Sequence, residues 1–468
     1  FIYYIIMRIT LCFIIFINLC ISLFGQVHFT RLNNEDGLSH SEVKAILQDS
    51  YGYMWIGTRN KLNRYDGCEF KVLDCYDPVA NRRNNNIAAL CEDANRLLWI
   101  GTDDGVFVYD PALETFTYLE RWLNPDQSAD FLYNWVSNIV ADKEGNMWVV
   151  LPSRGILKVN IQTKAYRLYS ISEDTVFGKG GPLSLTVDEQ GTIWAGCIEQ
   201  GICRYDRKKD EFVRVLKETG MFQGKGVYTM LSYKEFLLIA LHEGGLLKYN
   251  MDTKTLSLHD FPEVDKVMLR CLMMSKEEEL WVGTNNGIYI YNVLTGSCTN
   301  VKNDSFDSHS LSNNTVTTMY TDREKGIWVG TLYGGLNYQS RSAENFTVYI
   351  PNDHPQSVQS QWIHGLYWDE ETQKLWVGTE DEGCSVFDKN MSVFTPVNTH
   401  PTVTVTCIRK IDGNIWIGYF KNGLDVVSPS MKVTHYTGKE LGLKEESIFA
   451  FCEDHTGTIW ISDGGGVY

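Results

Sequence analysis

Six aspartates, one in each of six repeated units, are the residues of this sequence that most suggest acid–base chemistry. Each stands six residues before a tryptophan, in a turn such as Asp49-Ser50-Tyr51-Gly52. Short polar side chains in turns accept hydrogen bonds from nearby backbone N–H groups. Aspartates that recur once per unit also lie too far apart to form a catalytic pair of carboxylates. We therefore predict a turn-capping role for Asp49, Asp93, Asp142, Asp188, Asp322 and Asp454.

Motifs for nucleotide, metal and cofactor chemistry are missing. The sequence contains no Gly-x-x-x-x-Gly-Lys-Ser/Thr, no His-Glu-x-x-His and no Cys-x-x-Cys, so we predict no cofactor, no metal site and no catalytic residue. A disulfide between Cys68 and Cys75 within one unit is an open alternative to two free thiols. His364 is a single isolated candidate for a general base, and a structural histidine is the other interpretation.

The thirteen tryptophans fall into two groups. Nine occupy a repeated position and are expected in the core. Trp122, Trp135, Trp362 and Trp368 do not, and when the units are aligned on their acidic turns, Trp135 and Trp362 share the position just before the first strand. Packing does not require tryptophan there, because other units carry different residues. These are Glu42, Asn86, Gly181, Gly226, Met268 and Thr315.

The loop after the tryptophan strand lies at the same strand ends as this position, so both are expected on one face. The loop residues are Arg59, Asp103, His242, Asn285, Tyr333, Glu380 and Phe420. Aromatic rings flanked by polar side chains suit a saccharide, whose C–H face stacks while its hydroxyls form hydrogen bonds. We predict ligand binding by Trp135, Trp362, Arg59, His242 and Tyr333. The alternative is that both tryptophans anchor the interface between two domains or pack loops.

A unit that recurs ten times must position these residues. Trp55-Ile56-Gly57-Thr58 returns as Trp99-Ile100-Gly101-Thr102, and further copies continue to Trp460 at intervals of 40 to 49 residues. In each unit an apolar strand precedes the acidic turn, the tryptophan strand follows, and two more strands complete the unit. Short strands separated by Asp/Gly turns predict a four-stranded antiparallel meander. With this period, the sequence predicts an all-β fold, a β-propeller of four-stranded blades.

Two small-residue positions recur with the tryptophan. A glycine follows it by six or seven residues in nine units, where we predict a turn residue with positive φ, and Lys61 takes its place in the first unit. The small residue two after the tryptophan, such as Gly57, is predicted to let neighbouring sheets pack closely.

The unit count predicts how the chain is divided into domains. Seven units from Trp55 to Trp328 are enough for one closed seven-bladed ring at residues 26–345. The segment Val27-His28-Phe29-Thr30 is predicted to supply the outer strand of its last blade. Residues 346–468 are predicted to be the first three blades of a second, truncated propeller. A single ten-bladed ring is the alternative.

The two ends of the sequence and its charge add three expectations. Met7-Arg8, the apolar run after it and Gly25 predict a signal peptide within residues 1–25. The sequence stops inside its tenth unit, so we expect a fragment of a longer protein. A net charge of −16 disfavours contact with nucleic acid phosphates.

The first unit resembles a known family. The segments Leu38-Ser39-His40-Ser41-Glu42-Val43, 48–58 and Leu62-Asn63-Arg64-Tyr65-Asp66-Gly67 resemble the two-component regulator propeller repeat. This resemblance implies the periplasmic sensor of a hybrid two-component system histidine kinase from a Bacteroides-like bacterium, usually with two seven-bladed propellers. It also implies an oligosaccharide ligand, a homodimer in the full-length receptor and attachment to the inner membrane by a downstream helix.

We therefore expect an extracytoplasmic ligand-sensing region that is not itself an enzyme. Two other classes stay open: a secreted propeller enzyme of lyase or glycosidase type, and a protein-binding scaffold. An enzyme would need acids, a histidine base or metal ligands converging on one face, and the sequence shows no convincing set.

Overall fold

The computed structural model divides the chain into two compact units, unit 1 (Phe1–Asn345) and unit 2 (Phe346–Tyr468). The predicted signal peptide at residues 1–25 lies outside the described residues. The structure describes residues 27–123, 132–215, 222, 225–242, 245–258, 267–276, 278–341, 349–351, 356–388, 393–399 and 403–468.

The described residues of unit 1 form seven four-stranded antiparallel sheets, numbered here in chain order. Sheet 1 contains β2 (Val43–Gln48), β3 (Met54–Thr58), β4 (Leu62–Tyr65) and β5 (Phe70–Leu73). Sheet 2 contains β8 (Ile87–Glu92), β9 (Leu98–Thr102), β10 (Gly105–Asp110) and β11 (Thr115–Tyr118). Sheet 3 contains β12 (Asn138–Ala141), β13 (Asn146–Leu151), β14 (Gly155–Asn160) and β15 (Tyr166–Ser170). Sheet 4 contains β16 (Pro182–Val187), β17 (Ile193–Cys197), β18 (Ile202–Asp206) and β19 (Glu211–Arg214).

Sheet 5 contains β20 (Val227–Tyr233), β21 (Phe236–Leu241), β22 (Leu246–Asn250) and β23 (Thr255–Leu258). Sheet 6 contains β24 (Leu269–Lys276), β25 (Glu279–Thr284), β26 (Gly287–Asn292) and β27 (Cys298–Val301). Sheet 7 contains β28 (Val316–Thr321), β29 (Ile327–Thr331), β30 (Leu336–Gln339) and the N-terminal β1 (Thr30–Leu32).

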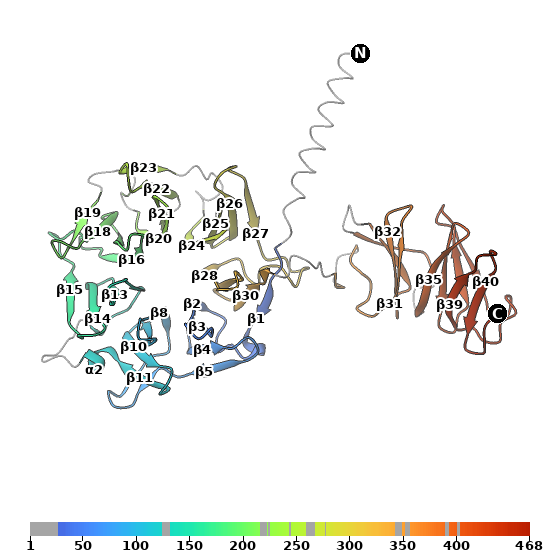
Figure 1. Cartoon of the computed structure of the whole chain (residues 1–468), viewed down its shortest axis with the longest axis horizontal. Coiled ribbons are helices and arrows are strands. Elements are labelled where there is room, and N and C mark those ends of the chain that lie inside the picture. Colours follow the sequence, from blue (N-terminus) through green and yellow to red (C-terminus); the bar gives the residue numbers. More distant parts are fainter. Residues whose placement is uncertain are drawn as a thin grey trace, which may run out of the picture. The chain divides into compact units, whose positions relative to one another are not determined.

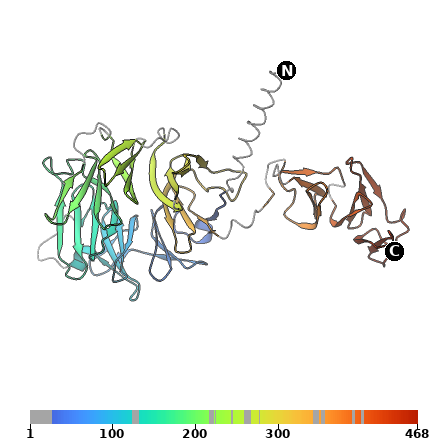
Figure 2. The ribbon, with the colours of Figure 1, turned by 45° about the horizontal axis from the view of Figure 1, so that its top comes forward.

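The sheets of unit 1 follow one another around a common centre (Figure 1). The first strand of each sheet contacts the first strand of the next, from β2 through β8, β12, β16, β20 and β24 to β28, and β28 contacts β2. In the turned view, the strands of sheets 2, 3 and 4 stand next to one another (Figure 2). This arrangement places equivalent strand ends of all seven sheets on the same edge of the unit.

An N-terminal strand completes the last sheet, as the sequence indicates. β1 pairs antiparallel with β30, and the Arg31 guanidinium donates to the backbone carbonyls of Ser310 and Asp307 at 2.9 Å each. The predicted strand was Val27 to Thr30, whereas the observed strand begins at Thr30. Phe29, which precedes it, is buried and donates its backbone N–H to the carbonyl of His309 at 2.7 Å.

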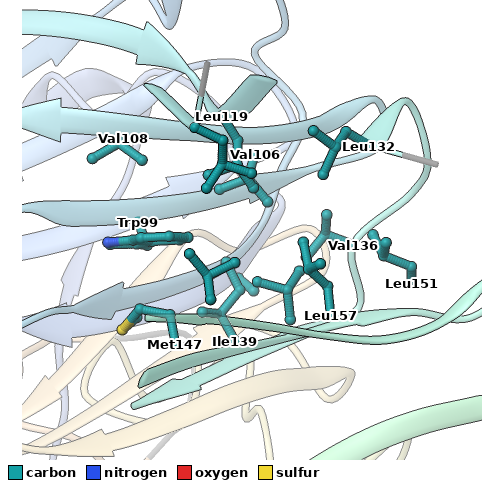
Figure 3. Packing of buried hydrophobic residues seen from close by; sticks show 14 of the residues in the cluster. Trp99, Val106, Val108, Leu119, Leu132, Val136, Ile139, Met147, Leu151 and Leu157 are labelled. Atoms are coloured by element: carbon teal, nitrogen blue, oxygen red, sulfur yellow. The ribbon is translucent and has the colours of Figure 1, made fainter. Parts of the chain in front are cut away.

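The hydrophobic core lies between neighbouring sheets (Figure 3). Trp99 of sheet 2 is fully buried in one cluster with Ile139 and Met147 of sheet 3. A Cβ atom added at Gly57 would lie 2.5 Å from Cγ2 of Ile87 in the next sheet. The prediction that a small residue allows this close approach is therefore confirmed.

Unit 2 repeats the same strand pattern. Sheet 8 contains β31 (Ile363–Asp369), β32 (Lys374–Thr379), β33 (Cys384–Asp388) and β34 (Val393–Pro396). Sheet 9 contains β35 (Val405–Ile411), β36 (Asn414–Tyr419), β37 (Leu424–Val427) and β38 (Val433–Tyr436). Sheet 10 is a pair of strands, β39 (Ile448–Glu453) and β40 (Ile459–Asp463). The predicted all-β class and the four-stranded antiparallel sheets are confirmed.

Short additional elements interrupt the repeat in unit 1. A 3₁₀ turn, η1, covers Asn34–Asp36. A hairpin of β6 (Tyr76–Asp77) and β7 (Arg82–Arg83) lies between sheets 1 and 2, and helix α2 (Leu119–Leu123) follows sheet 2. The hairpin and the helix belong to the connections that lead from one sheet to the next.

Candidate ligand-binding surface

One edge of unit 1 brings together the two sequence positions singled out for ligand binding. The residue after the second strand of a sheet donates its backbone N–H to the carbonyl of the residue before the first strand, as from Arg59 to Glu42 at 3.0 Å. The same hydrogen bond joins His242 to Gly226, Ile198 to Gly181, Asn285 to Met268 and Leu332 to Thr315. The predicted proximity of the two positions is confirmed. We call the edge formed by these two positions in all seven sheets the rim.

Four of the five residues predicted to bind ligand lie on the rim or directly beside it. Arg59 and His242 are the residues directly after β3 of sheet 1 and β21 of sheet 5. Tyr333 follows Leu332 after β29 of sheet 7, and Trp135 lies three residues before β12 of sheet 3. The side chains of Trp135 and Tyr333 are large and exposed, at 46% and 72% of their surface. Trp362, also exposed, precedes β31 in unit 2 and is therefore not part of this rim.

A row of polar contacts crosses the rim from sheet 1 to sheet 2. Glu42 lies 3.5 Å from both the Arg59 guanidinium and the Lys44 ammonium. Lys44 Nζ donates to Asn86 Oδ1 at 2.7 Å. Asn86 Nδ2 in turn donates to Asp103 Oδ2 at 2.9 Å. The row exposes both donors and acceptors, which is the pattern that sugar hydroxyl groups require.

A buried carboxylate ties the two inserted elements to each other at this edge. Asp77 of β6 is fully buried and accepts hydrogen bonds from the Arg121 guanidinium of α2 at 2.7 Å and from the Tyr118 N–H at 2.8 Å. The N–H groups of Val79 and Ala80 also donate to it. Burial opposes ionisation of Asp77, but these four donors outweigh it, so the pKa of this carboxyl lies below its usual range. The hairpin is thus fixed relative to α2.

Arg82 of the inserted hairpin places its guanidinium group near the segment that contains Trp135. The Arg82 guanidinium lies 4.3 Å from the centre of the Tyr133 ring, 5.7 Å from that of Tyr118 and 3.9 Å from Asp104 Oδ2. Tyr133 stands two residues before Trp135 in the chain. Cation–π contacts hold the guanidinium plane over the ring while part of Arg82 stays exposed. The sequence analysis did not name Arg82 or Tyr133 as candidate ligand-binding residues.

His242 and Tyr333 lie farther around the rim, in sheets 5 and 7. The His242 ring centre is 5.9 Å from that of Tyr228 in the same sheet. The structure shows no contact that joins either residue to Trp135 or Arg59 among the described residues. His242 and Tyr333 therefore lie on the same edge as the polar row but do not form one contact surface with it.

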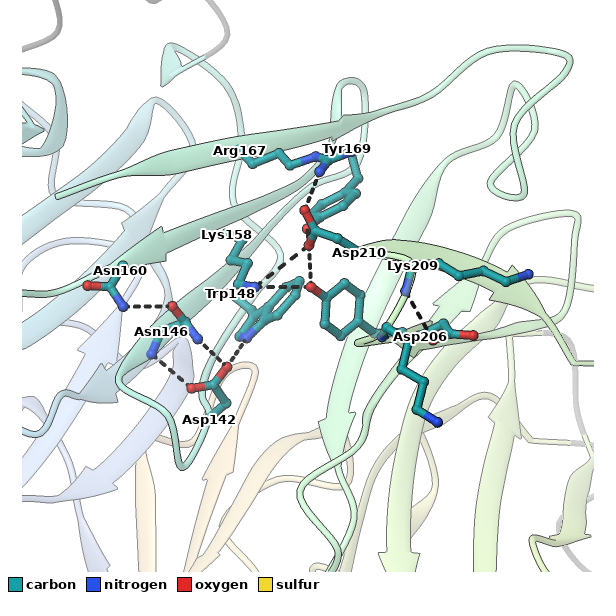
Figure 4. A network of polar contacts seen from close by, with 12 residues as sticks. Asp142, Asn146, Trp148, Lys158, Asn160, Arg167, Tyr169, Asp206, Lys209 and Asp210 are labelled. Atoms are coloured by element: carbon teal, nitrogen blue, oxygen red, sulfur yellow. Dashed lines mark hydrogen bonds and ion pairs between the residues drawn. The ribbon is translucent and has the colours of Figure 1, made fainter. Parts of the chain in front are cut away.

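The repeated aspartates have a structural role, as predicted, and that role includes one contact that the sequence did not reveal. In sheet 3, Asp142 Oδ1 accepts the backbone N–H groups of Glu144 and Asn146, while Oδ2 accepts the indole N–H of Trp148 at 2.8 Å (Figure 4). The same carboxylate–indole hydrogen bond joins Asp49 to Trp55, Asp93 to Trp99, Asp188 to Trp194, Asp322 to Trp328 and Asp454 to Trp460. The spacing of six residues therefore serves the core tryptophan as well as the turn.

Four of the ten units lack this aspartate. Ser232 stands six residues before Leu238, and Ser275 stands six before Trp281, whose indole N–H donates to Glu279 Oε1 at 2.7 Å. Glu370 and Lys410 stand six residues before Trp376 and Trp416. The indole Nε1 atoms of these two tryptophans are buried without a hydrogen-bond partner among the residues that the structure describes.

Among the described residues, no three metal-ligating side chains come together. His364 Nε2 lies 3.7 Å from Glu380 Oε2 in an exposed pair. Cys68 is exposed and Cys75 is buried, and both are free thiols, so the disulfide considered for them is not formed.

Another pair of cysteines lies closer together. The Sγ atoms of Cys197 and Cys203, both buried in sheet 4, are 3.9 Å apart, a contact between free thiols. Among the described residues, no helix combines the length and the apolar character that crossing a membrane requires.

Comparison with known proteins agrees with the repeat seen in the sequence. Residues 37–60, 81–104 and 310–333 match the family described as two component regulator propeller. A segment of 166 residues, 34% of this chain, is 25% identical to histidine kinase P4 of Formosa agariphila and spans 12% of that protein.

Solved structures extend the likeness to nearly the whole chain. The extracellular domain of one hybrid two-component system from B. thetaiotaomicron matches with a TM-score of 0.62 and 21% identity, over 94% of this chain and 65% of that one. A second extracellular domain from the same organism matches with a TM-score of 0.57 and 20% identity, over 93% of this chain and 64% of that one. A propeller-like fold is thereby confirmed. Three segments of the chain match the two-component regulator propeller repeat, and the chain shares its fold with extracellular domains of hybrid two-component systems.

Proposed function

We propose that this chain is the extracytoplasmic ligand-sensing region of a hybrid two-component sensor histidine kinase, and that it binds an oligosaccharide on the rim beside Trp135. The likeness to the extracellular domains of such systems supports the sensing role. The observation that carries the site is an exposed tryptophan beside a row of hydrogen-bonding side chains. Its chain neighbours Asn134 and Val136 form backbone hydrogen bonds with Gly105 and Thr102, on either side of Asp103. In this proposal the region would signal to a cytoplasmic kinase, and none of the residues of this chain is assigned to phosphotransfer.

The chemistry of the rim suits a saccharide better than a flat apolar partner. An indole that is 46% exposed offers a face on which the C–H groups of a pyranose can stack. Lys44, Asn86 and Asp103 provide donors and acceptors for hydroxyl groups in the adjacent sheets. The Arg82 guanidinium adds a planar donor that is held by Tyr133.

The architecture that we propose for the sensor is a seven-bladed propeller at residues 26–345 followed by the first three blades of a second ring. The sequence of first-strand contacts around unit 1 and the pairing of β1 with β30 support a closed first ring. In unit 2 the repeat tryptophan Trp460 of sheet 10 is 46% exposed, whereas Trp99 in unit 1 is fully buried. Further blades in the longer protein would cover this face.

The proposal includes export and membrane attachment. Residues 1–25 would act as a signal peptide, a downstream helix would anchor the receptor in the inner membrane, and the full-length receptor would form a homodimer. Alkaline phosphatase fused after residue 468 tests export, because the enzyme is active only outside the cytoplasm. Activity that depends on residues 1–25 is expected, and equal inactivity with and without them would contradict the proposal.

A binding experiment tests the rim. Purified chain is screened on a glycan array, and the strongest ligand is titrated by calorimetry against the wild type and the Trp135→Ala variant. Loss of one stacked ring is expected to weaken affinity about 5- to 30-fold, corresponding to about 1–2 kcal/mol.

Tyr51→Ala is a matched control. Tyr51 is also an exposed aromatic residue, but it lies in the turn between β2 and β3, at the opposite strand ends. Equal affinity of the wild type and the Trp135→Ala variant would reject the stacking role. Chromatography of the same incubations tests the sensing role, because accumulation of cleaved product would show an enzyme.

A further inference from the structure

Unit 2 contains a buried polar cluster in sheet 9 that is separate from the rim. The Tyr419 hydroxyl donates to Asp425 Oδ2 at 2.7 Å, and His435 Nδ1 lies 2.7 Å from Asp425 Oδ1. The Asp425 side chain is fully buried, and His435 faces it across the β37–β38 pair. A buried carboxylate with a partner on each oxygen holds those partners in fixed orientations.

The three residues depart from the repeat at positions where other units have different side chains. Tyr419 is the third residue after the repeat tryptophan, where five other sheets have a buried threonine. These are Thr58, Thr102, Thr284, Thr331 and Thr379. Burial of the Tyr419 hydroxyl and the adjacent Asp425 carboxylate raise the pKa of Tyr419 far above its usual range, so the hydroxyl stays a hydrogen-bond donor. Propeller packing alone does not require this cluster.

The cluster borders a pocket of about 390 Å³ within unit 2. The pocket lies between the segment after β34, which supplies Asn398 and Thr399, and the β37–β38 hairpin, which supplies Lys432 and His435. Met431 and Val433 add an apolar wall. This volume falls at the lower end of the range for small-molecule sites, about 300–1,000 Å³.

We propose that this pocket binds a small carboxylate ligand of the size of a sugar acid. Lys432 supplies a positive charge for the carboxylate. Because Nδ1 of His435 is engaged with Asp425, any hydrogen bond from this ring to a ligand comes from Nε2. The Asn398 amide and the Thr399 hydroxyl supply partners for ligand hydroxyl groups. This site lies in a different unit from the rim and does not depend on it.

Paired probes test the charge requirement on the full chain. Binding of D-galacturonate and of D-galactose, which has the same ring and no carboxylate, is measured by titration followed by NMR. Galacturonate is expected to bind at least about tenfold more tightly, the effect of one charge-assisted hydrogen bond. Equal affinities, or no saturable binding of galacturonate, would overturn the proposal.

Variants test the residues. Lys432→Gln is expected to lower galacturonate affinity at least about tenfold, while Lys439→Gln, an exposed lysine outside the pocket, should change it little. His435→Asn places an amide near the Nδ1 position, so it keeps the contact with Asp425 and removes Nε2. We expect His435→Asn to retain the unfolding temperature and to lose binding. Retained binding in both His435→Asn and Lys432→Gln would refute the site, whatever the rim binds.

Discussion

Replacing Asp93 by Asn isolates the carboxylate–indole hydrogen bond that recurs through the repeats. Asp93 Oδ2 accepts the Trp99 indole N–H at 2.9 Å, and Oδ1 accepts the N–H groups of Asn95 and Leu97 at 2.8 and 3.0 Å. An asparagine keeps the Oδ1 acceptor and therefore the turn. It places an NH₂ group against the indole N–H, so that two buried donors face each other.

The expected cost follows from burial. Asp93 is 5% exposed and Trp99 is fully buried, so water does not replace the lost bond. A hydrogen bond to a charged group contributes about 1.5–3 kcal/mol, and we expect Asp93→Asn to lower the free energy of unfolding by about 2 kcal/mol. In a double-mutant cycle with Trp99→Phe, the coupling energy should be about 1–2 kcal/mol.

Urea unfolding followed by circular dichroism measures these differences at the transition midpoint. Trp416→Phe is the control, because its Nε1 has no partner among the described residues and only ring area is lost. The reasoning would be refuted if the effects of Asp93→Asn and Trp99→Phe on the free energy of unfolding were additive. It would also be refuted if Trp99→Phe and Trp416→Phe lowered this free energy equally.

Three further predictions concern backbone strain, sheet packing and thiols. Lys61 has a φ of 84°, a backbone conformation that is strained for a residue with a Cβ atom. Lys61→Gly is therefore expected to raise the free energy of unfolding, measured with urea, by about 0.5–1 kcal/mol. A lower free energy of unfolding would contradict this strain. Gly57→Ala forces a Cβ to 2.5 Å from Ile87 and should cost about 1–3 kcal/mol in the same assay; an unchanged midpoint would show that the sheets can separate. Burial raises the pKa of Cys271 from 9.0 to about 12, so its contribution to stability is complete below pH 9 and is lost as pH rises toward 12. Between pH 9 and pH 12 the free energy of unfolding of the wild type should fall more steeply than that of Cys271→Ala. At pH 8, an aromatic disulfide reagent should label exposed Cys68 before Cys271.

Periodicity predicted the strands well because each unit repeats the same physical problem. One packing arrangement requires three features of each unit: the tryptophan, the small residue two positions later and the turn before them. One aligned pattern therefore describes nearly every sheet. Lys61 shows how strongly that arrangement acts: a residue with a Cβ adopts the positive φ that other units assign to glycine. In the tenth unit the pattern fails at Gly466, which has no positive φ. The assignment of the two units to two separate rings stays a prediction.

The partners of the repeated aspartates were only half predictable. Turn chemistry indicates the backbone N–H groups, since it depends on the next few residues of the chain. The indole contact depends on the twist that brings Oδ2 over the following strand, and a linear pattern does not contain that geometry. A spacing of six residues, shared by Asp49 and five other aspartates, was nevertheless a signal that the acid and the tryptophan act together.

The rim shows why comparison of equivalent positions between repeat units finds only some of the candidate ligand-binding residues. A position can be compared between units only if every unit has it, and this comparison is how Trp135 and Arg59 were found. Arg82 and Tyr133 stand in connections between sheets, which differ in length and sequence from unit to unit, so an equivalent residue cannot be aligned for comparison. They meet because the connections after sheets 1 and 2 extend over the same edge, where Asp77 ties one to the other. If the rim binds an oligosaccharide as proposed, exchange of the 74–86 segment for a shorter connection should alter which glycans bind while leaving the seven sheets intact.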